Sequence, residues 1–193
     1  MAHVVTCGLG ITIKSRDYLT VCNYCFTDRA DCINAMNSDI NNTINKISSG
    51  NLIADAILNN KAVVAAQSGN KIQFEGQFPK DGIADNDICT ILANALDNAI
   101  EATEKTDNSS VITVEAAVRM GNFILSISNP VNENIKIGKN NTMKTTKKNH
   151  AEHGIGVKNI QRVVKKYNGA LTLECENKIF SVNMRMNIQT KEN

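Results

Sequence analysis

Two asparagines, Asn94 and Asn98, stand four residues apart in a segment whose apolar residues recur at helical spacing, residues 87–104. At about 100° per residue, the two amides share one side of the predicted helix with Glu101, and Asp97 lies beside them. A face that only met solvent would favour lysine and glutamate, which form helices better than asparagine. Amide oxygens suit a hard cation such as Mg²⁺, and a nearby carboxylate can orient or deprotonate water. This helix alone fits an incidental polar face equally well.

A glycine pair opens a second predicted helix, at residues 155–167. In His153-Gly154-Ile155-Gly156, the missing side chains would let backbone N–H groups approach phosphate oxygens, and the helix dipole favours an anion there. A basic segment precedes it and contains Lys136, Lys139, Lys144, Lys147 and Lys148. Gly-x-Gly alone is as often a turn, but cations followed by an amide-rich helix start suit a polyphosphate. The chain has no Gly-x-x-x-x-Gly-Lys-Ser/Thr, which excludes a Walker-type nucleotide site.

A third polar feature lies at the end of a predicted strand, where Asn129 precedes Pro130. A carboxamide at a strand end in a cleft could hydrogen-bond the edge of an adenine. Asn-Pro is also a frequent turn initiator, and the pair alone favours that simpler interpretation.

The elements that must position these residues follow from the apolar pattern. Asn51 can cap a helix over residues 52–67, and Asn168-Gly169 can end the helix of residues 155–167. Alternation predicts strands near residues 72–74, 111–117, 123–128, 171–175 and 180–187. The second and third of these should pair antiparallel near Gly121, and the last two should form a hairpin. The polar, aperiodic residues 130–153 predict a long loop. Helices on one face of a mainly antiparallel sheet predict a two-layer α+β domain.

The composition fits one folded domain. The chain has 193 residues, is 42% hydrophobic and lacks Trp, so aliphatic side chains must build the core. A net charge of +2 gives no nucleic-acid or membrane signature. No apolar run approaches the roughly 18 residues that span a bilayer, and the N-terminus lacks a secretory pattern. We therefore expect a cytoplasmic protein, or the cytosolic part of a membrane sensor.

Four of the six cysteines crowd the first 32 residues: Cys7, Cys22, Cys25 and Cys32. Cys22 and Cys25 form a Cys-x-x-Cys pair, which could bind a metal or act in redox chemistry. Zinc sites usually show two paired clusters, so small reduced thiols buried on a helix are the alternative that we favour.

Together, the three polar motifs resemble the GHKL ATPases, the family of gyrases, histidine kinases and MutL. Residues 92–102 (LANALDNAIEA) resemble the N box, and residues 153–159 (HGIGVKN) resemble the glycine box that follows the ATP lid. The nearest branch is the Agr-type quorum-sensing sensor kinases, whose Asp-x-Gly-x-Gly box is reduced to an asparagine after a strand, as in Ser128-Asn129-Pro130. Residues 49–51 and 55–61 also resemble that branch. The resemblance covers about residues 45–188.

The resemblance implies the two-layer α/β sandwich of these ATPases, the Bergerat fold, and binding of ATP with Mg²⁺. It implies that Asn98 ligates the magnesium and that Asn94 supports the metal and the phosphates. Glu101 stands where relatives place a polar or charged residue near the metal and its water, which makes it the candidate catalytic residue. The other implied nucleotide-binding residues are Asn129 at the adenine, Gly154 and Gly156 at the phosphates, and Lys147 reaching over from the lid.

The resemblance also implies a domain organisation. Residues 49–193 would form the ATP-binding catalytic domain, and residues 1–48 an N-terminal segment with part of a dimerisation hairpin. The helix expected at residues 33–47 carries an apolar stripe of Ile33, Met36, Ile40, Ile44 and Ile47, which could form a homodimer or pack on its own domain. Kinases of this branch carry the histidine that accepts the phosphoryl group within a His-Asp-x-x-x-Asn-His-like stretch. No histidine of this sequence lies in such a stretch.

We therefore expect the ATP-binding catalytic domain of a sensor histidine kinase in two-component signalling. It would donate the γ-phosphate of ATP to a histidine outside this chain, and its partners would be a response regulator or a histidine-bearing dimerisation domain. One alternative is a non-catalytic nucleotide-binding regulatory module of the degenerate-kinase or anti-sigma kind. Another is a metal sensor that works through the N-terminal cysteines. We expect no nucleic-acid partner and no membrane segment in this chain.

Overall fold

A computed structural model gives the fold of the chain. It describes residues 46–106, 109–138 and 155–188, together with the short strands at residues 5–6, 12–13 and 142–143. The chain divides into two compact units, Met1–Asp39 and Ile40–Asn193.

In the first unit, the described part is one antiparallel strand pair, β1 (Val5–Thr6) with β2 (Thr12–Ile13). The helix predicted at residues 33–47 lies outside the described residues except at Lys46 and Ile47, which are not helical. The four N-terminal cysteines also lie outside the described residues.

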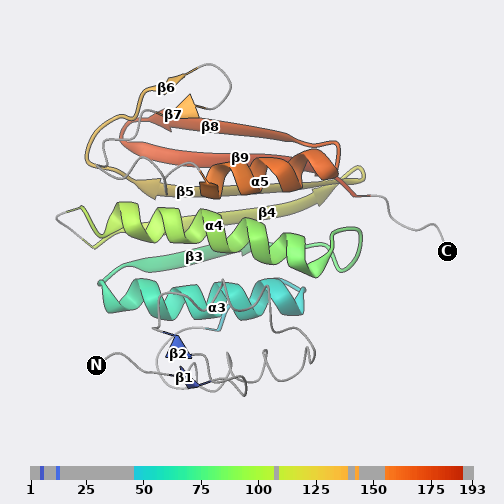
Figure 1. Cartoon of the computed structure of the whole chain (residues 1–193), viewed down its shortest axis with the longest axis horizontal. Helices are drawn as coiled ribbons and strands as arrows, with labels where there is room; N and C mark the ends of the chain where they lie inside the picture. The colour runs from blue at the N-terminus through green and yellow to red at the C-terminus, as the bar shows by residue number, and fades with distance from the viewer. Residues whose placement is uncertain are drawn as a thin grey trace. The chain divides into compact units, whose positions relative to one another are not determined.

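The second unit is built on a five-stranded mixed sheet in the order β3-β4-β5-β9-β8 (Figure 1). Its strands are β3 (Lys71–Gly76), β4 (Val111–Arg119), β5 (Asn122–Pro130), β8 (Ala170–Glu176) and β9 (Ile179–Asn187). β3 pairs parallel with β4, and the other neighbours pair antiparallel. Parallel neighbours need a crossover, and here a helix supplies it between β3 and β4.

Three helices in the described part of the chain cover one face of this sheet: α3 (Leu52–Gln67), α4 (Asp85–Thr103) and α5 (Ile155–Lys166). α4 packs against both other helices and runs between them (Figure 1). The predicted two-layer α+β architecture, with a mainly antiparallel sheet, is confirmed.

Alternation along the strands builds the core from one face of the sheet. On β5, Phe123, Leu125 and Ile127 are buried under the helices, whereas Ser126 and Ser128 point to the open face. The set predicted to share one side of the last strand is likewise buried: Phe180, Val182, Met184 and Met186. Because a strand has a period of two, these apolar residues fix which face of the sheet the helices cover.

The start of α3 matches its predicted cap. The Asn51 side chain accepts hydrogen bonds from the backbone N–H groups of Ile53 and Ala54 at 3.0 and 3.1 Å. Its amide nitrogen also donates to the Pro79 carbonyl at 2.9 Å, which ties the helix start to the chain that leaves β3. One asparagine therefore caps the helix and fixes its position beside the sheet.

The connections agree with the sequence in two places and differ in one. Gly121 and Asn168 adopt left-handed backbone conformations, with φ of 70° and 48°, at the β4–β5 turn and after α5. The segment predicted as a plain loop contains a small antiparallel pair, β6 (Ile137–Gly138) with β7 (Thr142–Met143). Two-residue strands are too short to show a hydrophobic period, so the sequence could not reveal them.

The end of α5 is joined to the start of α4 by a cluster of polar side chains. The Tyr167 hydroxyl donates to the Asp87 carboxylate at 2.6 Å and accepts from the Ala84 backbone N–H at 2.9 Å. The Lys166 ammonium pairs with the same carboxylate at 2.6 Å. Burial, followed by the hydrogen bond to Asp87, raises the pKa of Tyr167 above its usual 10.0. The hydroxyl thus satisfies the backbone N–H of the N-cap residue Ala84, whose own side chain cannot cap α4.

We expect Tyr167→Phe to lower the free energy of unfolding by about 1–2 kcal/mol at neutral pH, because it leaves Ala84 N–H and Asp87 each short of a partner. A raised pKa in the folded state gives stability that is present below pH 10.0 and lost as the pH rises through the folded pKa. The difference between wild type and variant should therefore shrink by about pH 11. Urea unfolding at both pH values measures it, and a difference that grows with pH would contradict the assignment.

Candidate functional site

The polar side of α4 carries the residues that the sequence singled out. Ile88, Ile91 and Leu92 are buried at 2% exposure or less, which fixes the rotation of the helix about its axis. Asn98 is exposed and Asn94 is partly buried. The Asn94 amide nitrogen donates to the Thr90 carbonyl at 2.7 Å, which holds this carboxamide in place.

The first turn of α5 comes against these two asparagines at Gly156. A Cβ added to Gly156 would lie 3.1 Å from Asn94 Oδ1 and 3.3 Å from the Asn98 amide nitrogen, closer than most Cβ contacts in proteins. The glycine therefore lets the backbone of α5 approach the two amides. The first N–H groups of a helix lack partners within it, so backbone donors of α5 lie beside the Asn94 amide oxygen and the Asn98 amide nitrogen at this point. The structure thus brings together Asn94, Asn98 and Gly156.

Glu101 lies on the next turn of α4, and its carboxylate pairs with Lys105 at 3.3 Å. Both side chains are substantially exposed, at 41% and 56%, so the pair is a surface ion pair of small energetic value. The predicted catalytic role of Glu101 stays a prediction.

Asn129 stands at the end of β5, on the face that the helices cover. It is 3% exposed, and its amide nitrogen donates to the Pro130 carbonyl at 2.9 Å. Asn129 belongs to β5, the strand on which α4 packs. Within the described residues, no hydrogen bond joins it to either asparagine. A buried amide at a strand end is compatible with the predicted adenine contact, which stays a prediction.

Two predicted site residues cannot be placed. Lys147 and Gly154 lie outside the described residues, as does most of the predicted lid.

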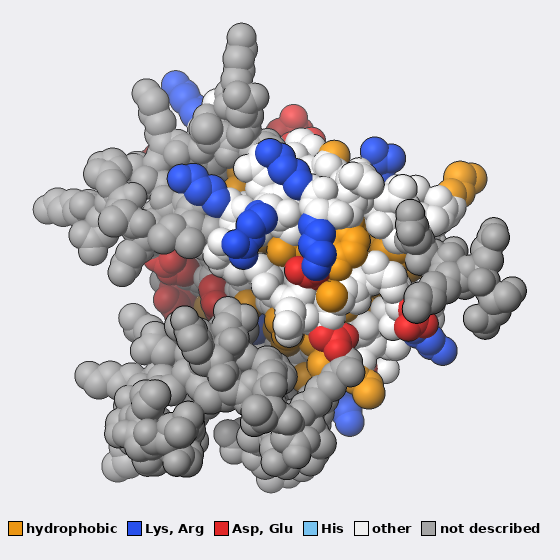
Figure 2. Space-filling model, turned by 45° about the vertical axis from the view of Figure 1, so that its right-hand side comes forward, with side chains coloured by type: hydrophobic (Ala, Val, Ile, Leu, Met, Phe, Trp, Pro, Cys, Tyr) orange, Lys and Arg blue, Asp and Glu red, His pale blue; other side chains and the backbone are white. Residues whose placement is uncertain are grey.

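The surface of α5 that faces solvent is basic. Its exposed positions include Lys158, Arg162, Lys165 and Lys166, opposite the buried Ile160, Val163 and Val164. Figure 2 shows several Lys and Arg side chains close together on one face of the molecule. A helix with a basic surface, whose first turn reaches the Asn94–Asn98 side of α4, gives that region a favourable electrostatic setting for an anion.

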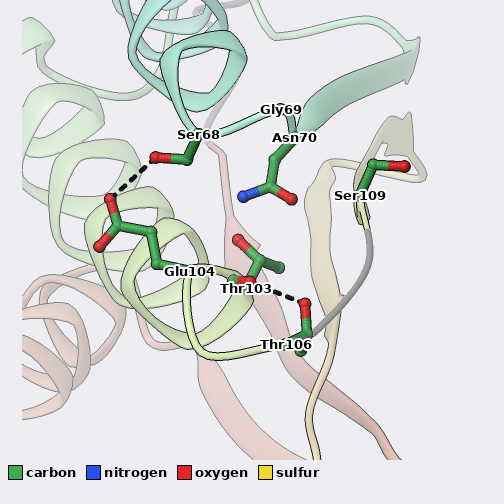
Figure 3. A pocket seen from close by; sticks show the side chains of 7 residues that line it. All are labelled: Ser68, Gly69, Asn70, Thr103, Glu104, Thr106 and Ser109. Atoms are coloured by element: carbon green, nitrogen blue, oxygen red, sulfur yellow. Dashed lines mark hydrogen bonds between the residues drawn. The ribbon is translucent and has the colours of Figure 1, made fainter.

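A polar pocket of about 330 Å³ lies elsewhere, where α3 and α4 end (Figure 3). Its lining residues are Ser68, Gly69, Asn70, Thr103, Glu104, Thr106 and Ser109. The Asn70 carboxamide oxygen accepts from Ser110 N–H at 2.9 Å, and its amide nitrogen is buried without a partner in the described structure. None of the predicted site residues lines this pocket, so it is separate from the region where Asn94, Asn98 and Gly156 meet.

Sequence reasoning missed one interaction beside the site, an ion pair between Lys61 of α3 and Asp97 of α4. The available signal was a lysine within the otherwise largely apolar stretch AILNNKAVVAA, residues 56–66. Lysines are seldom buried without a partner, so such a position predicts a carboxylate nearby.

Two kinds of feature are absent from the described residues. No helix there is long and apolar enough to cross a membrane. No group of three or more His, Cys, Asp or Glu side chains there could hold a metal ion.

The fold defines a class, the two-layer α/β domains in which α3, α4 and α5 cover one face of a five-stranded mixed sheet. A family model described as the GHKL domain matches residues 84–187, just over half of the chain. The chain belongs to the GHKL domain family. The match begins at the start of α4 and ends with β9, so it contains every predicted site residue.

Solved structures of low sequence identity share the fold. The catalytic domain of histidine kinase ThkA superposes with a TM-score of 0.57 at 14% identity, over 70% of this chain and 90% of that one. Full-length ShkA in complex with AMPPNP gives 0.56 at 15% identity, over 73% of this chain and 30% of that one. The Acinetobacter baumannii histidine kinase AdeS gives 0.51 at 13% identity, over 72% and 64% of the two chains. No curated protein sequence matches the chain.

Proposed function

We propose that this chain is the ATP-binding catalytic domain of a sensor histidine kinase, of a branch similar to the Agr-type sensors. The observation that carries the proposal is the contact region between Asn94, Asn98 and Gly156, formed by two helices of a GHKL domain. The similarity to histidine kinase catalytic domains supports it, as does the complex of ShkA with an ATP analogue.

The residues present fit a magnesium–polyphosphate complex. Asn98 is exposed, and its carboxamide oxygen is the candidate metal ligand. Asn94 Oδ1, which lies against Gly156, is the candidate support for the metal and the phosphates. The backbone N–H groups at the first turn of α5 are the candidate phosphate donors, since Gly156 allows the close approach. Bound magnesium would supply charge neutralisation at the phosphates. Asn129 is the candidate adenine contact, Gly154 is a further candidate phosphate contact, and Lys147 is the candidate contact from the lid.

The proposed reaction is transfer of a phosphoryl group to a histidine on a partner or on sequence outside this chain. An imidazole nitrogen forms a bond to the γ-phosphorus, and the bond from that phosphorus to the bridging oxygen breaks, so that ADP leaves with the electron pair. Glu101, one turn beyond Asn98, is the candidate to accept the imidazole proton.

The proposed function also implies a protein partner and a cellular location. A response regulator would accept the phosphoryl group from the histidine, and residues 1–48 would contain part of a dimerisation hairpin ahead of the catalytic domain at 49–193. We place the protein on the cytoplasmic side, where ATP is available. The second candidate, a non-catalytic regulatory module, is favoured by one observation: His3, His150 and His153 do not stand in an acceptor motif.

The test is to mix the purified chain with radiolabelled Mg²⁺–ATP, with and without a separate histidine-bearing dimerisation domain. We expect saturable nucleotide binding by the chain and acid-labile label on the added domain only. Binding with no transfer to a panel of such domains would favour the regulatory module. Absence of any Mg²⁺–ATP binding would refute both functions.

A further inference from the structure

A buried lysine on α3 pairs with the residue that precedes Asn98, the candidate metal ligand. The Lys61 side chain is 10% exposed, and its neighbours Leu58, Ala62 and Ala65 on α3 are buried in the core. An ammonium group in such a place is costly unless it is paired. Its partner is the carboxylate of Asp97 on α4.

Asp97 is placed so that this pairing matters for Asn98. It directly precedes Asn98 in α4, and its side chain is 53% exposed, so its charge would reach a ligand bound on the exposed side of the helix. Successive residues in a helix are about 100° apart, which lets Asp97 face α3 while Asn94 and Asn98 face α5. The pair with Lys61 holds the carboxylate on the α3 side.

The charges on α4 explain why Asp97 needs a cationic partner. The helix DNDICTILANALDNAIEAT has four acidic residues and no basic one. The two acids nearest the asparagines, Asp97 and Glu101, each pair with a lysine from outside the helix, Lys61 and Lys105. An unpaired carboxylate on the residue next to Asn98 would repel a bound polyphosphate, because like charges in a partly desolvated site interact strongly. Of these two pairs, only the pair of Lys61 with Asp97 has a buried cation, whose charge is screened little by solvent.

We propose that Lys61 is a positioning residue of the nucleotide site. It holds the Asp97 carboxylate away from the Asn94–Asn98 side of α4 and neutralises its charge, and it does not itself contact the nucleotide. This inference rests on the proposed function, since it concerns the affinity of the same site for a polyphosphate.

The experiment compares Lys61→Met, Asp97→Asn and the double variant by calorimetric titration with Mg²⁺–ATP. Methionine keeps the length of the lysine stem and removes the charge, so it leaves Asp97 unpaired but solvated. We expect Lys61→Met to weaken binding about three- to tenfold at about 50 mM salt, and clearly less at about 500 mM, because salt screens the freed carboxylate. Asp97→Asn added to Lys61→Met removes that carboxylate and should restore the affinity to within about twofold.

Rescue separates a charge effect from a structural one. If Lys61 only supported the packing of α3 on α4, the double variant would bind as poorly as Lys61→Met, which would overturn the proposal. Unchanged affinity in Lys61→Met would overturn it as well. Lys80→Met is the matched control: it removes an exposed lysine from the loop before α4 and should leave the affinity unchanged. Urea unfolding of each variant checks that it is folded at the titration temperature.

The outcomes also separate this inference from the function on which it rests. A wild-type chain that binds Mg²⁺–ATP, together with an unaffected Lys61→Met, would refute only the role of Lys61. A wild-type chain that does not bind Mg²⁺–ATP would refute the proposed function and this inference with it.

Discussion

Asn98→Ala is expected to weaken Mg²⁺–ATP binding about ten- to over a hundredfold while leaving the fold intact. The substitution removes the candidate ligand oxygen, and losing a hydrogen bond or ligand contact to a charged group costs about 1.5–3 kcal/mol, which corresponds to that change in affinity. Alanine has a higher helix propensity than asparagine, and the Asn98 side chain is exposed, so α4 should not be destabilised. Titration calorimetry with and without Mg²⁺ measures the effect.

The same helix supplies the control. Asn86→Ala makes the same chemical change at an exposed position near the start of α4, away from the first turn of α5, and should leave the affinity unchanged. If Asn98→Ala unfolds like wild type and binds Mg²⁺–ATP equally well, Asn98 is not the metal ligand. If the variant loses affinity equally for ATP in the presence and absence of Mg²⁺, its role lies with the phosphates instead.

Local signals predicted most of the fold. The bounds of α3 agree with the sequence because its start depends on one asparagine side chain, Asn51, and its end on the nearby Gly69. The paired strands β4 and β5 also agree, since alternation and a glycine turn specify both strands and their connection. These features depend on residues close in the chain, whose physical preferences act without tertiary context.

The start of α4 could not be predicted correctly from local sequence signals. The sequence placed it at residue 87, but the helix begins at Asp85 after Ala84, which has no side chain able to cap it. What holds this helix start is a hydrogen bond from the Ala84 N–H to the Tyr167 hydroxyl, 83 residues further along the chain. No local pattern could reveal a partner at that separation.

The candidate site likewise has features that local sequence predicts and features that it does not. The sequence placed Asn94, Asn98 and Glu101 on one side of a helix, because helical geometry alone relates them. The approach of Gly156 to Asn94 and Asn98 needed the resemblance to the GHKL family, since it joins residues from two helices. The Lys61–Asp97 pair needed the structure, because the order of the residues does not specify which face of α3 meets α4.

Gly76→Ala is expected to be the most destabilising of these substitutions, by about 1.5–3.5 kcal/mol. Gly76 ends β3 with φ of 104°, a conformation that costs a residue with a Cβ about 1–2 kcal/mol. A Cβ there would lie 1.8 Å from the Ala116 carbonyl oxygen on β4, which accepts a hydrogen bond from Gln77 N–H at 3.0 Å. The strands must separate to admit it, so that bond is also lost, at about 0.5–1.5 kcal/mol.

Gly69→Ala is the matched control because it separates the backbone cost from the steric one. Gly69 also has a positive φ, of 75°, but an added Cβ would meet no atom within 4 Å. It should therefore cost only the conformational part, about 1–2 kcal/mol. Urea unfolding of both variants measures the difference. Equal losses would mean that β3 can move away from Ala116 at little cost, in which case the close approach of the two strands does not hold this edge of the sheet.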